Sequence, residues 1–244
     1  MQGPSSGAVM IAGLLVAIGV GIGGYFVGDG FYEGRQSARY VTVKGLAERP
    51  VKADVATWPL RFTATGDDLG SAQAKIEADA RALLAFLAER GLPAADAKLQ
   101  RLEVVDQLAQ QYRSGPLQGN RFIITQTVLV RTEAVDLVAS LSRDLGELVK
   151  SGIVLQDQMG PTYAFTGLND IKPEMIAEAT RNARDSAERF AADSGSSVGS
   201  ILRANQGVFQ ILPLVQGEMY GVGEAGQIDK KVRVVATVDY LLDD

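Results

Sequence analysis

A long amphipathic segment in the last third of the chain constrains the fold most. Residues 168–195 (LNDIKPEMIAEATRNARDSAERFAADSG) predict one helix, because apolar side chains recur at three- and four-residue steps. The stripe consists of Ile176, Ala179, Ala183, Ala187 and Phe190. Its central alanines allow a close approach, so we expect the helix to lie flat on a sheet.

Both ends of this helix carry recognisable signals. Asp170 is expected to cap the start, Pro173 to occupy the first turn and Gly195 to end the helix.

The remaining body predicts strands interleaved with two more helices. Alternating apolar residues predict strands at 40–44, 51–65, 98–111, 121–132, 198–211 and 229–242, with a broken strand at 153–165. Helical spacing predicts helices at 67–89, capped by Asp67 or Asp68, and at 133–150. Pro59 predicts an edge or a bulge in its strand. Because hairpins are frequent, the predicted fold class is α+β, with a mostly antiparallel sheet and helices packed on one face.

The N-terminal segment predicts a single transmembrane helix before this body. Residues 1–28 contain no charged side chain, and residues 8–27 form a continuous run of apolar and small residues. Twenty helical residues span roughly 30 Å, the thickness of a bilayer's hydrocarbon core. A removed signal sequence is the alternative, but there is no basic n-region and no convincing cleavage site. We therefore expect an anchor at 1–28, a linker at 29–39 and one domain at 40–244.

Four glycines in the expected anchor are candidate contact residues. Gly19 with Gly23, and Gly24 with Gly28, have the spacing that lets membrane helices pack backbone to backbone. The alternative is that glycine is simply common in membrane helices.

The charges beside the anchor give an ambiguous orientation. Arg35, Arg39 and Lys44 all follow the segment and no positive charge precedes it. Taken alone, the positive-inside rule would place the body in the cytoplasm. This conflicts with the extracytoplasmic location considered below.

A glycine-rich loop at 212–228 is the second candidate contact surface. It carries Leu214, Val215, Met219 and Tyr220 among its glycines. Loops of this length inside compact domains are usually functional or disordered. Its apolar residues favour contact with another subunit over plain disorder.

Composition excludes several kinds of chemistry. The chain has no cysteine and no histidine, which rules out thiol catalysis, disulfides, the usual zinc ligand sets and histidine bases. A net charge of −5 argues against nucleic acid as a partner. Lys230, Lys231 and Arg233 are interpreted as the solvated side of a strand.

One stretch matches a nucleotide-binding motif in its residue types but not in its predicted structural context. Residues 221–226 (GVGEAG) match the dinucleotide fingerprint, but that motif must open a helix, whereas this copy leads into a predicted strand. No serine lies in a nucleophile elbow, and no acidic group has calcium-loop spacing. We therefore expect no catalytic, cofactor-binding or metal-binding residues, and no enzyme.

The start of the body resembles a known family. The stretch YVTVKGLAERPVKADVAT at 40–57 resembles the opening of SIMPL-domain proteins, in which a short strand, a turn and a second strand follow one another. Gly45, Glu48, Pro50, Asp54 and Ala56 fit that opening. Residues 168–195, SILRANQGVFQI and KKVRVVATVDYLL are similar to a bacterial branch of the same family, so the resemblance covers residues 39–243.

The resemblance implies more about location and assembly than about activity. It implies an exported, periplasmic α+β domain that self-associates, in at least one relative into a hollow, channel-like ring, with loose links to envelope and oxidative stress. Many relatives have a cleaved signal, whereas this chain is expected to keep its anchor. The resemblance supplies no catalytic residues.

These observations together predict a function in assembly. We expect a single-pass protein of the bacterial inner membrane, held in the bilayer through residues 8–27, with its domain in the periplasm. Its expected partner is itself, in a ring- or cage-like homo-oligomer with a structural or stress-related role. The alternative is a monomeric envelope module that binds a small ligand or a partner protein.

Overall fold

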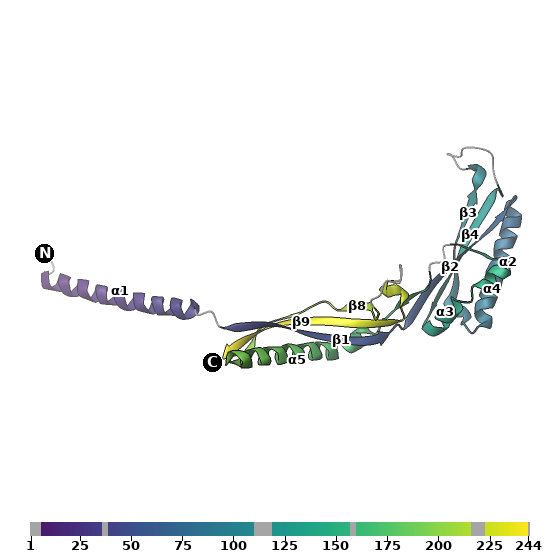
Figure 1. Cartoon of the computed structure of the whole chain (residues 1–244). Helices are drawn as coiled ribbons and strands as arrows, with labels where there is room; N and C mark the ends of the chain where they lie inside the picture. The colour runs from purple at the N-terminus through teal and green to yellow at the C-terminus, as the bar shows by residue number, and fades with distance from the viewer. Residues whose placement is uncertain (1–5, 36–38, 110–118, 157–159, 216–222, 244) are drawn as a thin grey trace. The chain divides into compact units, whose positions relative to one another are not determined.

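The computed structural model describes residues 6–35, 39–109, 119–156, 160–215 and 223–243 (Figure 1). Its helices are α1 (Ser6–Arg35), α2 (Leu69–Glu89), α3 (Val135–Leu141), α4 (Gly146–Lys150) and α5 (Leu168–Ser194). Its strands are β1 (Tyr40–Lys52), β2 (Val55–Gly66), β3 (Ala97–Asp106), β4 (Phe122–Thr132), β5 (Val154–Gln156), β6 (Thr162–Ala164), β7 (Ser197–Gln206), β8 (Gln210–Pro213) and β9 (Asp229–Asp243). Short 3-10 helices are η1 (Ala94–Asp96), η2 (Gln107–Ala109) and η3 (Glu224–Gly226). The predicted α+β class is confirmed.

The strands form two sheets rather than the single sheet expected. A four-stranded sheet has the order β1-β9-β7, with β8 also paired to β9. A five-stranded sheet has the order β3-β4-β2-β5, with β6 also paired to β2. The β2–β4, β3–β4, β2–β5, β2–β6 and β8–β9 pairings are all antiparallel.

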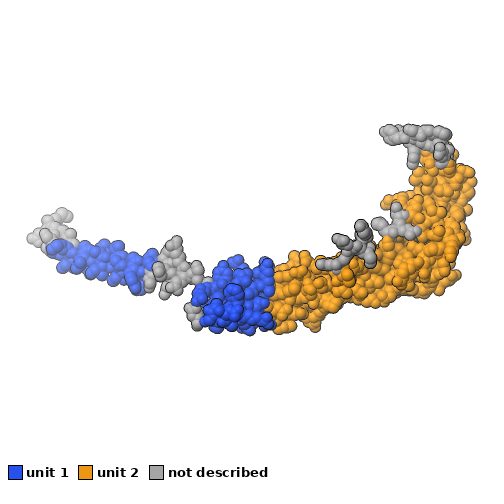
Figure 2. Space-filling view, viewed as in Figure 1, with its two compact units in different colours: residues 1–44, 183–205, 237–244 blue, residues 45–182, 206–236 orange. Residues whose placement is uncertain are grey.

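The chain divides into two compact units, coloured separately in Figure 2. One unit contains residues 1–44, 183–205 and 237–244, and the other contains residues 45–182 and 206–236. The first unit has a small core whose buried hydrophobic residues are Val41, Val43, Ala183, Ala187, Ala191, Val238 and Tyr240.

The second unit holds the larger core, between the five-stranded sheet and three helices. Helices α2, α3 and α4 lie together against one face of this sheet (Figure 1). Alternate residues of β2 point into the core, and Trp58 and Phe62 are its largest buried side chains. The N-cap of α2 is Asp68, whose carboxylate accepts the backbone N–H of Ser71 at 2.9 Å. Gly91, at φ +91°, follows the end of α2 in a conformation that favours glycine.

Pro59 lies in the middle of β2, between the residues that pair with β6 and those that pair with β5. On one side Pro59 is opposite Leu129 of β4. On the other side β6 pairs with residues 55–57 and β5 with residues 61–63, so neither of these two strands lies opposite Pro59. The predicted edge or bulge is not found among the described residues, because β2 lies between β4 on one side and β5 and β6 on the other, and its register with β4 passes Pro59 without a shift.

Helix α5 keeps the predicted boundaries but buries a slightly different face. The buried positions recur at exact four-residue steps, and they are Met175, Ala179, Ala183, Ala187 and Ala191. Phe190, predicted to lie in the stripe, is 59% exposed, and Ile176 is only half-buried. Small alanines line most of the buried row, and the large aromatic ring lies outside it. Gly195, at φ +71°, ends the helix as expected.

Three predicted boundaries are wrong. β1 runs without a break through residues 45–50, where the resemblance implied a turn. The helix predicted at 133–150 is two short helices, α3 and α4, separated at residues 142–145. The strand predicted at 198–211 is interrupted between β7 and β8, where Gly207 donates its backbone N–H to the carbonyl of Val235 at 2.8 Å.

Helix α1 extends to Arg35, so residues 29–35 of the expected linker are helical. Counted over the described residues, no helix is both long and apolar enough to cross a membrane. The expected membrane span at 8–27 therefore stays a prediction.

Candidate functional site

An apolar groove lies between helix α2 and the outermost strand of the five-stranded sheet. It has a volume of about 510 Å³. Its apolar lining is Ile76, Ala80 and Leu84 from α2 with Leu99 and Leu102 from β3, and its polar lining is Gln73, Glu77, Arg81 and Gln126. The groove can accept apolar side chains, with polar groups around them.

Strand β3 is an edge strand with unusual exposure of apolar side chains. It pairs with β4 and with no other described strand. Leu99, Leu102 and Val104 are each 46–48% exposed. An edge strand presents unpaired N–H and C=O groups, so a hydrophobic edge of this length is a place where another strand can add.

A bulge puts the groove leucines of β3 on the same side. The pairing passes from Leu99 opposite Val128 to Leu102 opposite Gln126, so three steps along β3 match two along β4. In a regular strand, residues three apart point to opposite faces. The extra residue restores the phase, so both leucines line the groove.

The charges along β3 are divided by sign. Its first half carries Lys98 and Arg101, and its second half carries Glu103 and Asp106. Arg101 is 82% exposed, with its nearest carboxylate, that of Glu103, at 3.7 Å. Glu103 also accepts a hydrogen bond from Arg61 at 3.1 Å.

Asp106 is held by contacts within its own chain. Arg121 donates to this carboxylate from Nη2 at 2.7 Å and from Nε at 3.1 Å, and the backbone N–H of Leu108 donates at 2.9 Å. The hydrogen bond from Arg121 is the main cause of the lowered pKa of Asp106. The same hydrogen bond raises the pKa of Arg121. This pair fastens the end of β3 to the start of β4.

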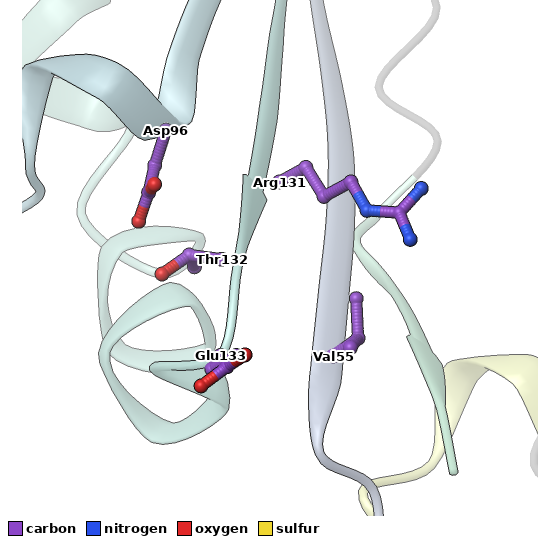
Figure 3. Close-up of a pocket in the computed structure, with 5 residues that line it drawn as sticks. All are labelled: Val55, Asp96, Arg131, Thr132 and Glu133. Carbon is purple, nitrogen blue, oxygen red and sulfur yellow. The ribbon is translucent and has the colours of Figure 1, made fainter. Parts of the chain in front are cut away.

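A second hollow is polar and open. It has a volume of about 410 Å³ and is lined by Val55, Asp96, Arg131, Thr132 and Glu133. Figure 3 shows the guanidinium of Arg131 on the far side of β2 from Asp96, so the cation and this carboxylate do not converge. The polar side chains of this lining do not point toward one common position. Elsewhere in the described part of the chain, no three acidic side chains gather into a metal-binding group.

Asp54, a residue of the family-like opening, fastens the start of helix α5. Its carboxylate accepts the backbone N–H of Thr166 at 2.9 Å, the hydroxyl of Thr166 at 3.0 Å and the backbone N–H of Gly167 at 3.2 Å. Asp170, predicted to be the cap, lies inside the helix instead. The cap comes from the junction between β1 and β2, which lies more than a hundred residues away in the sequence.

The comparison with protein families decides the classification. The family model described as SIMPL, a protein of unknown function (DUF541), matches residues 41–240. The chain belongs to the SIMPL family. The match covers nearly all of the body that resembled this family in sequence. No curated protein matches the chain significantly.

The SIMPL domain contains one buried cation that the sequence analysis misplaced. Lys230, predicted on the solvated side of its strand, is 0% exposed. Its ammonium donates to the carboxylate of Glu224 and, at 2.5 Å, to the backbone carbonyl of the same residue. The signal that was missed is the alternation of the strand, which is called strand parity below. Alternate residues point to the same face, and Lys230 therefore shares its face with Val232 and Val234, which are also buried.

The predicted contact residues lie in separate parts of the SIMPL protein. Gly19, Gly23, Gly24 and Gly28 are on α1, and a Cβ on any of them would meet no described atom within 4 Å outside the local helix. Their exposure is compatible with a helix-packing role.

The loop residues are only partly described. Leu214 and Val215 follow β8, and Val215 is 67% exposed. Met219 and Tyr220 lie outside the described residues. The sequence analysis singled out none of the β3 residues, because an edge strand is recognised only once its pairing is known.

Proposed function

We propose that this SIMPL protein acts by assembly. In this proposal it is a membrane-anchored, extracytoplasmic protein whose copies associate into a ring- or cage-like homo-oligomer with a structural or stress-related role in the envelope. The proposal rests chiefly on one observation, the exposed apolar edge of β3.

Two exposed edges support self-association. The ten-residue strand β3 ends one sheet, and the ten-residue strand β7 lies at the edge of the other. Ile201 and Leu202 of β7 are exposed, as are the β3 leucines. Edge strands of this length are normally shortened or covered, and a neighbouring subunit is one way to cover them.

The N-terminal segment supports anchoring. Residues 1–28 carry no charge. The exposed side chains of α1 include Leu14, Val16 and Val20. A cluster of anchors would give the glycine pairs neighbours to pack against.

Light scattering of the full-length chain in detergent, coupled to size exclusion, tests the assembly. We expect a mass several times that of one 25.9 kDa chain after subtraction of the detergent. A monodisperse monomer across the accessible concentration range would contradict the proposal. Protease accessibility on intact spheroplasts tests the side of the membrane, because digestion of the domain is expected only if it is extracytoplasmic.

The groove between α2 and β3 favours a second candidate function, the binding of a small envelope ligand. A concave apolar site with a few polar groups is the usual form of a ligand site. A ligand-dependent rise in the melting temperature of the monomer would favour this candidate over assembly.

A further inference from the structure

We infer that β3 pairs antiparallel with β3 of a second copy of this chain, about a two-fold axis through Leu102. The inference rests on the proposed self-association and names the surface and register that carry it. The two five-stranded sheets would then join edge to edge, and each groove would continue across the axis.

The backbone of β3 presents the hydrogen-bonding groups that such an addition requires. Its outward N–H and C=O groups have no partner strand among those described. Strand addition satisfies such groups with main-chain hydrogen bonds, and the side chains that alternate along the strand set the specificity. A two-fold axis makes the contact self-complementary and closes it.

In this arrangement, apolar side chains of one β3 lie opposite apolar side chains of the other. Leu102 lies opposite Leu102 of the second copy, because the axis passes through it. The bulge between Leu99 and Leu102 adds one residue that has no partner of its own. When this extra residue is left out of the count, Leu99 lies opposite Val104 of the second copy. These residues share the groove side of the sheet, so they form one continuous apolar row across the contact.

The bulge is what makes this row possible. Without it, Leu99 would lie on the opposite face from Leu102 and would leave the row. With it, Leu99 and Leu102 both line the groove beside α2, and Val104, two residues further on, falls on the same side by strand alternation.

The division of charge selects antiparallel over parallel pairing. Antiparallel pairing brings the basic half of one β3 to the acidic half of the other and sets Arg101 opposite Glu103. Parallel pairing in register would set like charges side by side, which is destabilising. The guanidinium of Arg101 is 82% exposed, and its only described ion pair is a long one of 3.7 Å to Glu103 of its own chain, so it can exchange that contact for Glu103 of the second copy.

Cysteine cross-linking of the full-length chain in detergent tests the register. The chain has no cysteine, so Leu102→Cys introduces a single thiol. Residues directly opposite in an antiparallel pair have Cα atoms about 4.5–5.5 Å apart, within the range that a disulfide spans. We expect mild oxidation to convert most of the Leu102→Cys protein to a linked dimer. The matched control is Val149→Cys on α4, which is 54% exposed and should stay largely unlinked.

A mixing experiment tests the same register with cysteines placed away from the axis residue. Leu99→Cys and Val104→Cys proteins should form the linked dimer efficiently when mixed, and much less when each is oxidised alone. Equal linking of all combinations would show random collision and overturn the register.

A charge exchange tests the polar side of the contact. Arg101→Glu should weaken the dimer by on the order of tenfold, because the two-fold axis creates two like-charge contacts at once. Adding Glu103→Arg to the same chain should restore association.

The outcomes separate this inference from the proposed function. If the wild-type chain is associated by light scattering but Leu102→Cys fails to link, self-association stands and the β3 contact is wrong. If the wild-type chain is a monomer, both are wrong. If β3 is protected only when another protein is present, the occupant is not a second copy and the inference is overturned.

Discussion

Replacing Asp54 by alanine tests how the SIMPL domain holds the start of its longest body helix. The change removes the acceptor for two backbone N–H groups and one hydroxyl, at 2.9–3.2 Å. Loss of a helix cap destabilises a protein by about 0.5–2 kcal/mol, and a hydrogen bond to a charged group contributes about 1.5–3 kcal/mol. Asp54 is only half-buried, so water replaces part of what is lost. We expect the free energy of unfolding to fall by about 2 kcal/mol.

Thermal unfolding followed by circular dichroism measures this effect. In a domain of roughly 200 residues, 1 kcal/mol shifts the melting temperature by about 2–4 °C, so Asp54→Ala should lower it by about 4–8 °C. Asp54→Asn keeps one acceptor oxygen and should lose less. Asp67→Ala removes an exposed carboxylate of the same type and should change little.

Hydrogen exchange locates the effect. The amides of Thr166 and Gly167 should lose protection in Asp54→Ala before the rest of α5 does. The reasoning is refuted if Asp54→Ala melts at the wild-type temperature and both amides stay protected, because the start of α5 would then be held by something other than this carboxylate.

Three further changes probe the core, the helix face and the acid response. Glu224→Ala leaves the ammonium of Lys230 buried without its anion and should destabilise the domain by about 3 kcal/mol in urea unfolding, whereas adding Lys230→Met should recover much of that loss. Ala187→Leu overfills the buried row of α5 and should destabilise by about 1–3 kcal/mol, but Phe190→Ser should stay within about 0.5 kcal/mol by the same measurement. The N–H of Ser71 lowers the pKa of Asp68 below its ordinary value of 3.8, so the contribution of Asp68 is present above that pH and lost as the pH falls through the folded pKa. The stability advantage of wild type over Asp68→Asn in urea unfolding should therefore be complete near pH 6 and shrink below pH 3.8.

Local signals made much of the fold predictable from the sequence. Helix α2 follows from its spacing, from the cap at Asp68 and from Gly91, which are all properties of a short stretch of chain. The β3–β4 hairpin follows from alternation on both sides of a turn. These signals need no knowledge of what packs against the element.

Two of the missed features depend on partners that are distant in the sequence, and a third depends on strand parity. The cap of α5 comes from Asp54, so no local pattern around Asp170 reveals it. Lys230 lies on the same buried face of β9 as Val232, with its ammonium bonded to Glu224 of η3, and a lysine next to Lys231 suggests a solvated face unless strand parity is counted. The exposed edge of β3 depends on the order of strands in the sheet, which the sequence leaves open.

In the proposed assembly, the residues that hold the fold differ from those that carry the association, and this separation can be tested. Asp54 and Ala56 of the family-like opening serve the architecture, one as a cap and the other as a fully buried core residue. Arg101 is an exposed edge residue, and such substitutions usually change stability by no more than about 0.5 kcal/mol. Arg101→Glu should therefore weaken association by light scattering and leave the melting temperature of dilute protein unchanged. Asp54→Ala should do the reverse at temperatures where it remains folded. If both variants lower stability and association together, the β3 edge is part of the folded core and does not act as a separate contact surface.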